Sequence, residues 1–158
     1  MNLAPHLIGR RRFGTAIAAL ALAPFAPARA NEPPLIEVWK SPTCGCCKDW
    51  IAHVEANGFR TRVHDNGNTD ARQRLGVDIR YGSCHTALVA DYAIEGHVPA
   101  REIKRLLVEK PAAIGLAVPA MPLGSPGMDG PEYGGRKDAY DVLLLTKGKG
   151  ASVFQAYR

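Results

Sequence analysis

The sequence predicts an α/β fold in which short strands alternate with helices. Three observations lead to this prediction. An apolar run at residues 35–40 follows two prolines, a helical pattern of apolar residues comes next, and two later strand-like runs meet in a tight turn. Such alternation is typical of a sheet covered by helices.

The first strand is predicted at residues 35–40, LIEVWK, with a helix soon after it. Asn57-Gly58 is expected to end this helix, because glycine readily takes the backbone conformation that follows a last helical turn. The apolar face of the helix has the spacing i, i+3, i+4, i+7. Its members are Cys47, Trp50, Ile51 and Val54.

Five further elements follow before residue 111. Residues 59–65 alternate apolar and polar side chains, which predicts a second strand. Residues 68–76 carry a capping signal and end in glycine, which predicts a short helix. Residues 86–90 and 92–96 read as a hairpin, and residues 99–110 as a helix with proline at its start.

The last third of the chain changes in composition. Residues 111–140 are rich in proline and glycine without a hydrophobic period, so a long loop is predicted. Residues 141–157 hold two strand-like runs around a Lys-Gly-Lys-Gly turn, a terminal hairpin that adds to the sheet or packs against it. The order of elements is that of thioredoxin, with a cysteine cluster at the first strand-to-helix junction. We therefore expect a thioredoxin-like three-layer α/β fold with a long Pro/Gly-rich loop and a C-terminal β-hairpin.

The N-terminus has the features of a cleavable export signal. Three arginines at residues 10–12 precede a short apolar run, and Ala-Arg-Ala at residues 28–30 matches a cleavage site. The arginine pair with Phe13 close behind also resembles a twin-arginine signal. We predict a signal peptide at residues 1–30 and one domain at residues 31–158. The apolar run is too short to span a bilayer, so no membrane span is expected in the mature chain.

Net charge gives no indication of a nucleic-acid partner. Residues 1–30 contain four of the 20 lysines and arginines and none of the 15 acidic residues, which leaves 16 basic against 15 acidic residues. No basic run with interleaved aromatic residues remains in the mature sequence. Binding of nucleic acid is therefore not expected.

Three of the four cysteines lie within four residues, at Cys44, Cys46 and Cys47. A helix N-terminus favours ionised thiols, which both metal binding and disulfide exchange require. Cys44 and Cys47 have the C-x-x-C spacing of a redox disulfide, but a third thiol between them would attack that bond or stay reactive. Three convergent soft donors suit a thiophilic metal.

The fourth cysteine is expected beside the other three. In the thioredoxin order, the loop before the third strand lies against the first helix, which places Cys84 and His85 there. That loop normally carries a cis-proline, yet the chain has no proline between Pro42 and Pro99. A thiol and an imidazole in its place favour a metal over a peptide substrate.

Other interpretations of these residues stay open. The four cysteines could form two structural disulfides, or with histidine a closed zinc site. Copper is favoured by Met121 and Met128, which lie in the long loop and could equally be exposed or fill gaps. His97 either lines the site or belongs to a helix cap. His53 and His64 are expected to be ordinary polar surface residues.

Three stretches resemble a known family: WKSPTCGCCKDW, SCHTALVADYAIEGHVPAREIKRLL and GLAVPAMPLGSPGM. Together they resemble the CopG-type exported copper-resistance proteins, from residue 35 to about residue 154. The resemblance implies a thioredoxin-like fold with a C-x-C-C copper site in the periplasm and a role in copper redox interconversion or detoxification. Cys44, Cys46 and Cys47 match the C-x-C-C thiolates, and Cys84 matches the additional cysteine. The remaining expected ligands stand in matching motifs, namely His85, His97, Met121 and Met128.

The expected function is therefore copper binding in copper resistance. Cu(I) would be held by the cysteines and interconverted with Cu(II), and bridging thiolates could hold more than one copper; zinc is the weaker alternative. Partners would be copper ions, with a copper efflux system or a periplasmic redox partner. Two other functions stay open: a periplasmic thiol-disulfide oxidoreductase, and a copper chaperone without redox activity.

Overall fold

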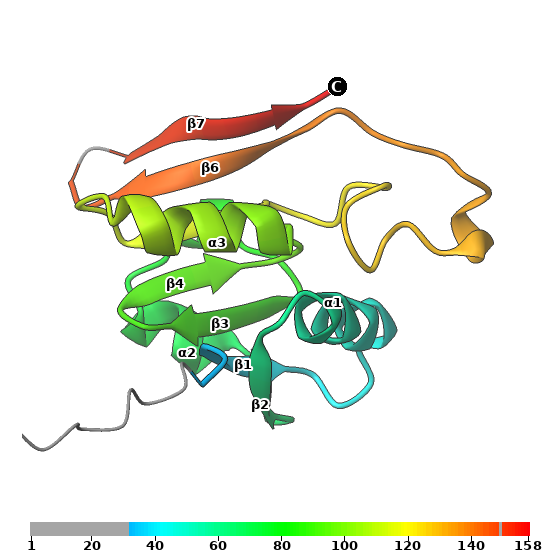
Figure 1. Ribbon diagram of the computed structural model, residues 1–158, viewed down its shortest axis with the longest axis horizontal. Coiled ribbons are helices and arrows are strands. Elements are labelled where there is room, and N and C mark those ends of the chain that lie inside the picture. The colour runs from blue at the N-terminus through cyan, green and yellow to red at the C-terminus, as the bar shows by residue number, and fades with distance from the viewer. Residues whose placement is uncertain (1–31, 149) are drawn as a thin grey trace, which may run out of the picture. The chain divides into compact units, whose positions relative to one another are not determined.

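The computed structural model describes residues 32–148 and 150–158, so the expected signal peptide at residues 1–30 lies outside the described residues. Seven strands form one sheet in the order β2-β1-β3-β4-β5-β6-β7 (Figure 1). The strands are β1 (Leu35–Lys40), β2 (Arg60–His64), β3 (His85–Val89), β4 (Tyr92–Glu95), β5 (Gly115–Ala117), β6 (Tyr140–Thr146) and β7 (Gly150–Tyr157). The helices are α1 (Gly45–Ala56), α2 (Thr69–Arg74) and α3 (Ala100–Glu109), with 3₁₀ turns η1 (Ile79–Tyr81) and η2 (Pro131–Tyr133).

The first four strands have the thioredoxin-like arrangement that the order of elements predicts. β1 pairs in parallel with β2 and antiparallel with β3, and β3 forms a hairpin with β4. Beyond them, β5 runs parallel to β4, and the β6–β7 hairpin pairs antiparallel with β5. The C-terminal hairpin therefore adds to the sheet, as one of the two expected arrangements.

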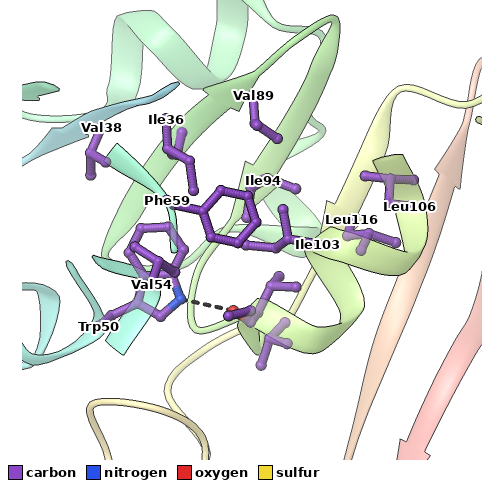
Figure 2. Close-up of a cluster of buried hydrophobic side chains, with 14 of the residues drawn as sticks. Ile36, Val38, Trp50, Val54, Phe59, Val89, Ile94, Ile103, Leu106 and Leu116 are labelled. Atoms are coloured by element: carbon purple, nitrogen blue, oxygen red, sulfur yellow. Dashed lines mark hydrogen bonds between the residues drawn. The ribbon is translucent and has the colours of Figure 1, made fainter. Parts of the chain in front are cut away.

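Apolar side chains lie on both faces of the sheet, which makes three layers. On one face, α1 and α3 contribute Trp50, Val54, Ile103 and Leu106 to the larger core (Figure 2). On the other, Val77 after α2 packs with small residues of β4 and β5 and with Tyr81 of η1. Successive strand residues point to opposite faces. In β4, Ile94 therefore belongs to the larger core, and its neighbour Ala93 belongs to the other.

The prediction of an unbroken loop at residues 111–140 was wrong at β5. Its three residues are all buried between β4 and β6, so they show neither alternation nor enough length for a pattern. Gly115 is required by a close backbone approach, because a Cβ there would collide with the carbonyl oxygen of Ala93. The chain thus places a short inner strand inside a segment whose composition indicates a loop.

No helix within residues 32–148 and 150–158 is long and apolar enough to cross a membrane.

Candidate metal centre

The N-cap of α1 comes soon after β1, with three residues between it and Lys40. Cys44 is the N-cap residue of α1, and its N–H donates to Ser41 O at 3.1 Å. In the described structure no side chain accepts a hydrogen bond at this cap. The backbone N–H groups of the first turn are therefore left without a side-chain partner beside these cysteines.

The structure brings all four cysteines together. Their sulfur atoms lie within 4.8 Å of one another. Cys84 Sγ is 3.3 Å from Cys47 Sγ and 3.9 Å from Cys46 Sγ, which confirms its expected placement beside the first turn of α1. Cys44 Sγ is 3.6 Å from Cys46 Sγ. Four sulfurs at these separations could share one metal ion or bridge several.

Two of the four sulfurs are joined in this structure. Cys44 and Cys47 form a disulfide, while Cys46 and Cys84 are free thiols. The alternative of two structural disulfides is therefore wrong. Because a disulfide sulfur carries no thiolate charge, the four-thiolate site exists only when this bond is reduced.

His97 faces the cluster with a defined tautomer. Its Nδ1 lies 2.7 Å from the carbonyl oxygen of Pro126, and its Nε2 lies 3.0 Å from Cys84 Sγ. A carbonyl only accepts, so Nδ1 carries the proton and the Nε2 lone pair points to the sulfur. Burial of the ring lowers its pKa and keeps it neutral. A neutral imidazole oriented by a backbone carbonyl is the usual state of a histidine metal ligand.

His85 also lies close to the Cys84 sulfur. Its Nδ1 is 3.4 Å from Cys84 Sγ, and the ring packs between Trp50 and His97. Burial lowers its pKa well below the ordinary value. Its Nε2 is buried without a hydrogen-bond partner among the described residues, a costly state for a polar atom. Cys84, His85 and His97 form a second close donor group that shares one sulfur with the first.

The Cys84 thiol is held in its protonated form when no metal is bound. Burial is the main cause that raises the pKa of this thiol to about 12, and the neighbouring Cys46 adds to the effect. A metal that binds here must displace this proton, so its binding is coupled to proton release.

The Pro/Gly-rich loop folds over the start of α1. Besides the Pro126 carbonyl, Gly127 approaches so closely that a Cβ would lie 2.6 Å from Cys46 O and 2.8 Å from Trp50 N. Met121 is 46% exposed, and Met128 Sδ accepts a hydrogen bond from Tyr133 Oη at 3.5 Å. Their role as copper ligands stays a prediction.

A buried polar network supports the loop that carries Cys84. Glu95 Oε1 accepts from Ser83 N at 2.7 Å and from Arg72 Nε at 2.9 Å. Burial raises the pKa of Glu95, and these hydrogen bonds act in the opposite direction. Asn68, the N-cap residue of α2, belongs to the same network. Its side chain does not cap the helix as expected, and its Nδ2 instead donates to Ser83 O at 3.2 Å. A glutamate at the end of an otherwise apolar strand was the sequence signal for this network.

Two other histidines have separate roles. His53 is half-buried, and its Nε2 accepts from Ala100 N at 3.1 Å at the start of α3, so its prediction as a surface residue was wrong. His64 stacks on Trp39 at the end of β2, with its side chain 36% exposed, as a surface residue.

Similarity to known proteins agrees with this geometry. The family described as "Protein of unknown function, DUF411" matches residues 81–128, which include Cys84, His85 and His97. Two solved structures are titled "Copper resistance protein copG", Form 1 and Form 2. Form 1 is 48% identical over 80% of this chain and 98% of its own, with a TM-score of 0.73. Form 2 is 46% identical over 80% of this chain and 100% of its own, with a TM-score of 0.72.

No curated protein matches the chain. The two solved structures are similar to this chain over nearly their whole length, and the family assignment rests on them. With their identity, coverage and shared fold, the chain belongs to the CopG family of copper resistance proteins.

Proposed function

We propose that this protein is an exported copper-binding protein of copper resistance that holds Cu(I) through Cys44, Cys46, Cys47 and Cys84. The observation that carries the proposal is the convergence of four sulfur atoms within 4.8 Å at a helix N-terminus. Soft thiolates prefer Cu(I) among the metals available to such a site. Copper-resistance relatives at 46% and 48% identity support the choice of metal.

The donor set also supports interconversion of Cu(I) and Cu(II). His97 Nε2 and His85 Nδ1 lie 3.0 Å and 3.4 Å from Cys84 Sγ, and imidazole nitrogen suits Cu(II) better than thiolate does. Each thiolate has enough lone pairs to bridge two metals, so a multinuclear copper cluster fits the cysteines. Copper could thus give one electron to, or take one from, a periplasmic redox partner while donors of both kinds are in reach.

Loading of the four-sulfur site is coupled to reduction of the Cys44–Cys47 disulfide. Reduction takes two electrons and two protons from a dithiol, which becomes a disulfide itself, and yields two thiols on this chain. Copper then displaces the thiol protons. A periplasmic dithiol protein would serve as the redox partner, and a copper efflux system would receive the metal.

The N-terminal sequence and the family both support a location outside the cytoplasm. We propose that residues 1–30 direct export and are removed, and that residues 31–158 act as a single domain in the periplasm. A twin-arginine route would export the domain already folded.

A thiol-disulfide oxidoreductase is the second candidate. The Cys44–Cys47 disulfide favours it, because this bond spans a C-x-x-C motif at the start of α1. Against it, Cys84 occupies the position at which a cis-proline would hold a peptide substrate, and the peptide bonds of the described residues are all trans. A copper chaperone without redox activity would use the same sulfurs and differ only in keeping copper as Cu(I).

Metal analysis of protein purified without chelator from copper-supplemented cells tests the proposal. We expect copper in clear excess over zinc, and loss of most copper in Cys46→Ser with the fold retained. Zinc in equal or greater amount would contradict the copper assignment. Copper that stays Cu(I) under both oxidant and reductant would favour the chaperone.

A further inference from the structure

Two charged side chains, Glu95 and Arg72, are buried beneath the loop that carries Cys84. Glu95 is fully buried at the end of β4, and the Arg72 side chain in α2 is 10% exposed, with Nη2 2.8 Å from Glu95 Oε1. Desolvation offsets most of the attraction in a buried ion pair, so such a pair does little for stability by itself. Its contacts with the backbone indicate what else it does.

Both backbone groups of Ser83 are bound by this pair. Ser83 N donates to Glu95 Oε1 at 2.7 Å, and Ser83 O accepts from Arg72 Nη2 at 2.6 Å. The second of these groups is the carbonyl of the peptide bond that leads into Cys84. On the far side of Cys84, Thr86 Oγ1 donates to Glu95 Oε2 at 2.6 Å. One carboxylate therefore fixes the chain before and after the cysteine.

The position of Cys84 decides the shape of the sulfur cluster. The other three cysteines lie at or beside the first turn of α1, whereas Cys84 comes from a different element and must be held at the right distance. Thioredoxin-like proteins normally fix this loop with a cis-proline. Here the peptide bonds of the described residues are trans, and charged hydrogen bonds hold the loop instead.

We propose that the Arg72–Glu95 pair is a positioning element that fixes the Cys84 sulfur against the α1 cysteines and so sets the copper affinity of the site. The copper part rests on the proposed function. The positioning part does not, because it concerns the metal-free protein.

Thiol reactivity in the metal-free protein tests the positioning. In the disulfide form only Cys46 and Cys84 are free, so iodoacetamide labelling followed by peptide mass spectrometry gives two rates, with Cys46 as internal reference. Glu95→Gln removes the charge, and Arg72→Lys keeps the charge but removes the planar fork. Both should raise the Cys84-to-Cys46 rate ratio several-fold. Glu37→Gln, which breaks the exposed Arg62–Glu37 pair, should leave it unchanged.

Thermal unfolding shows which variants are folded, and Arg72→Lys decides the question if Glu95→Gln does not fold. An unchanged rate ratio in the folded variants would overturn the proposal. A rise of the same size in the rate ratio of Glu37→Gln would also overturn it, because among the described residues the Arg62–Glu37 pair makes no hydrogen bond to the Cys84 loop.

A double-mutant cycle tests whether the pair acts through Cys84. Cu(I) affinity of the reduced protein should fall about tenfold in Glu95→Gln. In the Cys84→Ser background, Glu95→Gln should lower the Cu(I) affinity by less than about twofold, because the sulfur that the pair positions is absent. Equal losses in both backgrounds would overturn the proposal. If the unmodified protein binds no Cu(I), the proposed function fails, and the labelling experiment still decides the positioning.

Discussion

His97 Nε2 lies 3.0 Å from Cys84 Sγ, while its Nδ1 is bound to the carbonyl oxygen of Pro126 at 2.7 Å. The long loop therefore sets the orientation of an imidazole at the sulfur cluster. The loop reaches the site through this carbonyl and through the close approach of Gly127 to α1. Each contact leads to a prediction of its own.

Replacement of His97 by Asn should weaken copper binding by about tenfold, because the variant loses a nitrogen donor oriented by Pro126. Competition against a calibrated Cu(I) chelator measures the change. His64→Asn is the matched control, since that ring stacks on Trp39 in the described structure and lies at the end of β2. Equal affinity in His97→Asn and the unmodified protein would exclude His97 from the copper site.

Gly127→Ala should destabilise the domain by about 1–3 kcal/mol. The residue has φ +83°, and a Cβ would collide with Cys46 O and Trp50 N. Gly134→Ala is the control, because Gly134 also has a positive φ, +62°, but open space around its Cβ position. Urea unfolding should show a clearly larger loss of stability for Gly127→Ala. Equal losses would mean that the loop does not pack tightly on α1.

Substitution of Met121 and Met128 by Leu tests the thioethers while it keeps the apolar volume. We expect weaker retention of Cu(I) and faster air oxidation of the bound metal, because thioethers favour Cu(I) over Cu(II). Chelator competition and the rate of Cu(II) formation measure the two effects. If both match the unmodified protein, the loop acts through Pro126 and Gly127 alone.

Reduction of insulin should be slow compared with a standard thioredoxin-fold oxidoreductase. The loop before β3 presents Cys84 in place of a cis-proline, and Cys46 stands between the paired Cys44 and Cys47. Turbidity of insulin under a dithiol reductant measures the rate. Efficient turnover that disappears in Cys44→Ser or Cys47→Ser would favour the oxidoreductase over the copper protein.

Much of the fold could be predicted because its elements carry clear periodicity. The strand at residues 35–40 and the apolar face of α1 are visible in the sequence, and the topology then places Cys84 beside α1. β5 was not predictable, since three buried residues show no period. The Arg72–Glu95 pair joins residues 23 positions apart, and a strand pattern does not reveal which buried charge finds a partner. His53 was likewise missed because its acceptor role depends on α3 packing beside α1.

The disulfide was the least expected feature of the site. The sequence contains the C-x-x-C spacing, but the third cysteine within it indicated metal binding over disulfide formation. The structure shows the same sulfurs as a bonded pair with two free thiols next to it. These two descriptions agree if the pair is the oxidised, metal-free form of a site that takes copper after reduction.

A Cu(I) titration of the reduced and the disulfide forms, in competition with a calibrated chelator and beside a zinc titration, tests this account most directly. The reduced protein should bind Cu(I) far more tightly than Zn(II). The disulfide form should lose most of that affinity, because Cys44 and Cys47 then supply no thiolates. Equal Cu(I) affinity in the two forms, or zinc binding as tight as copper binding, would contradict a four-cysteine copper site.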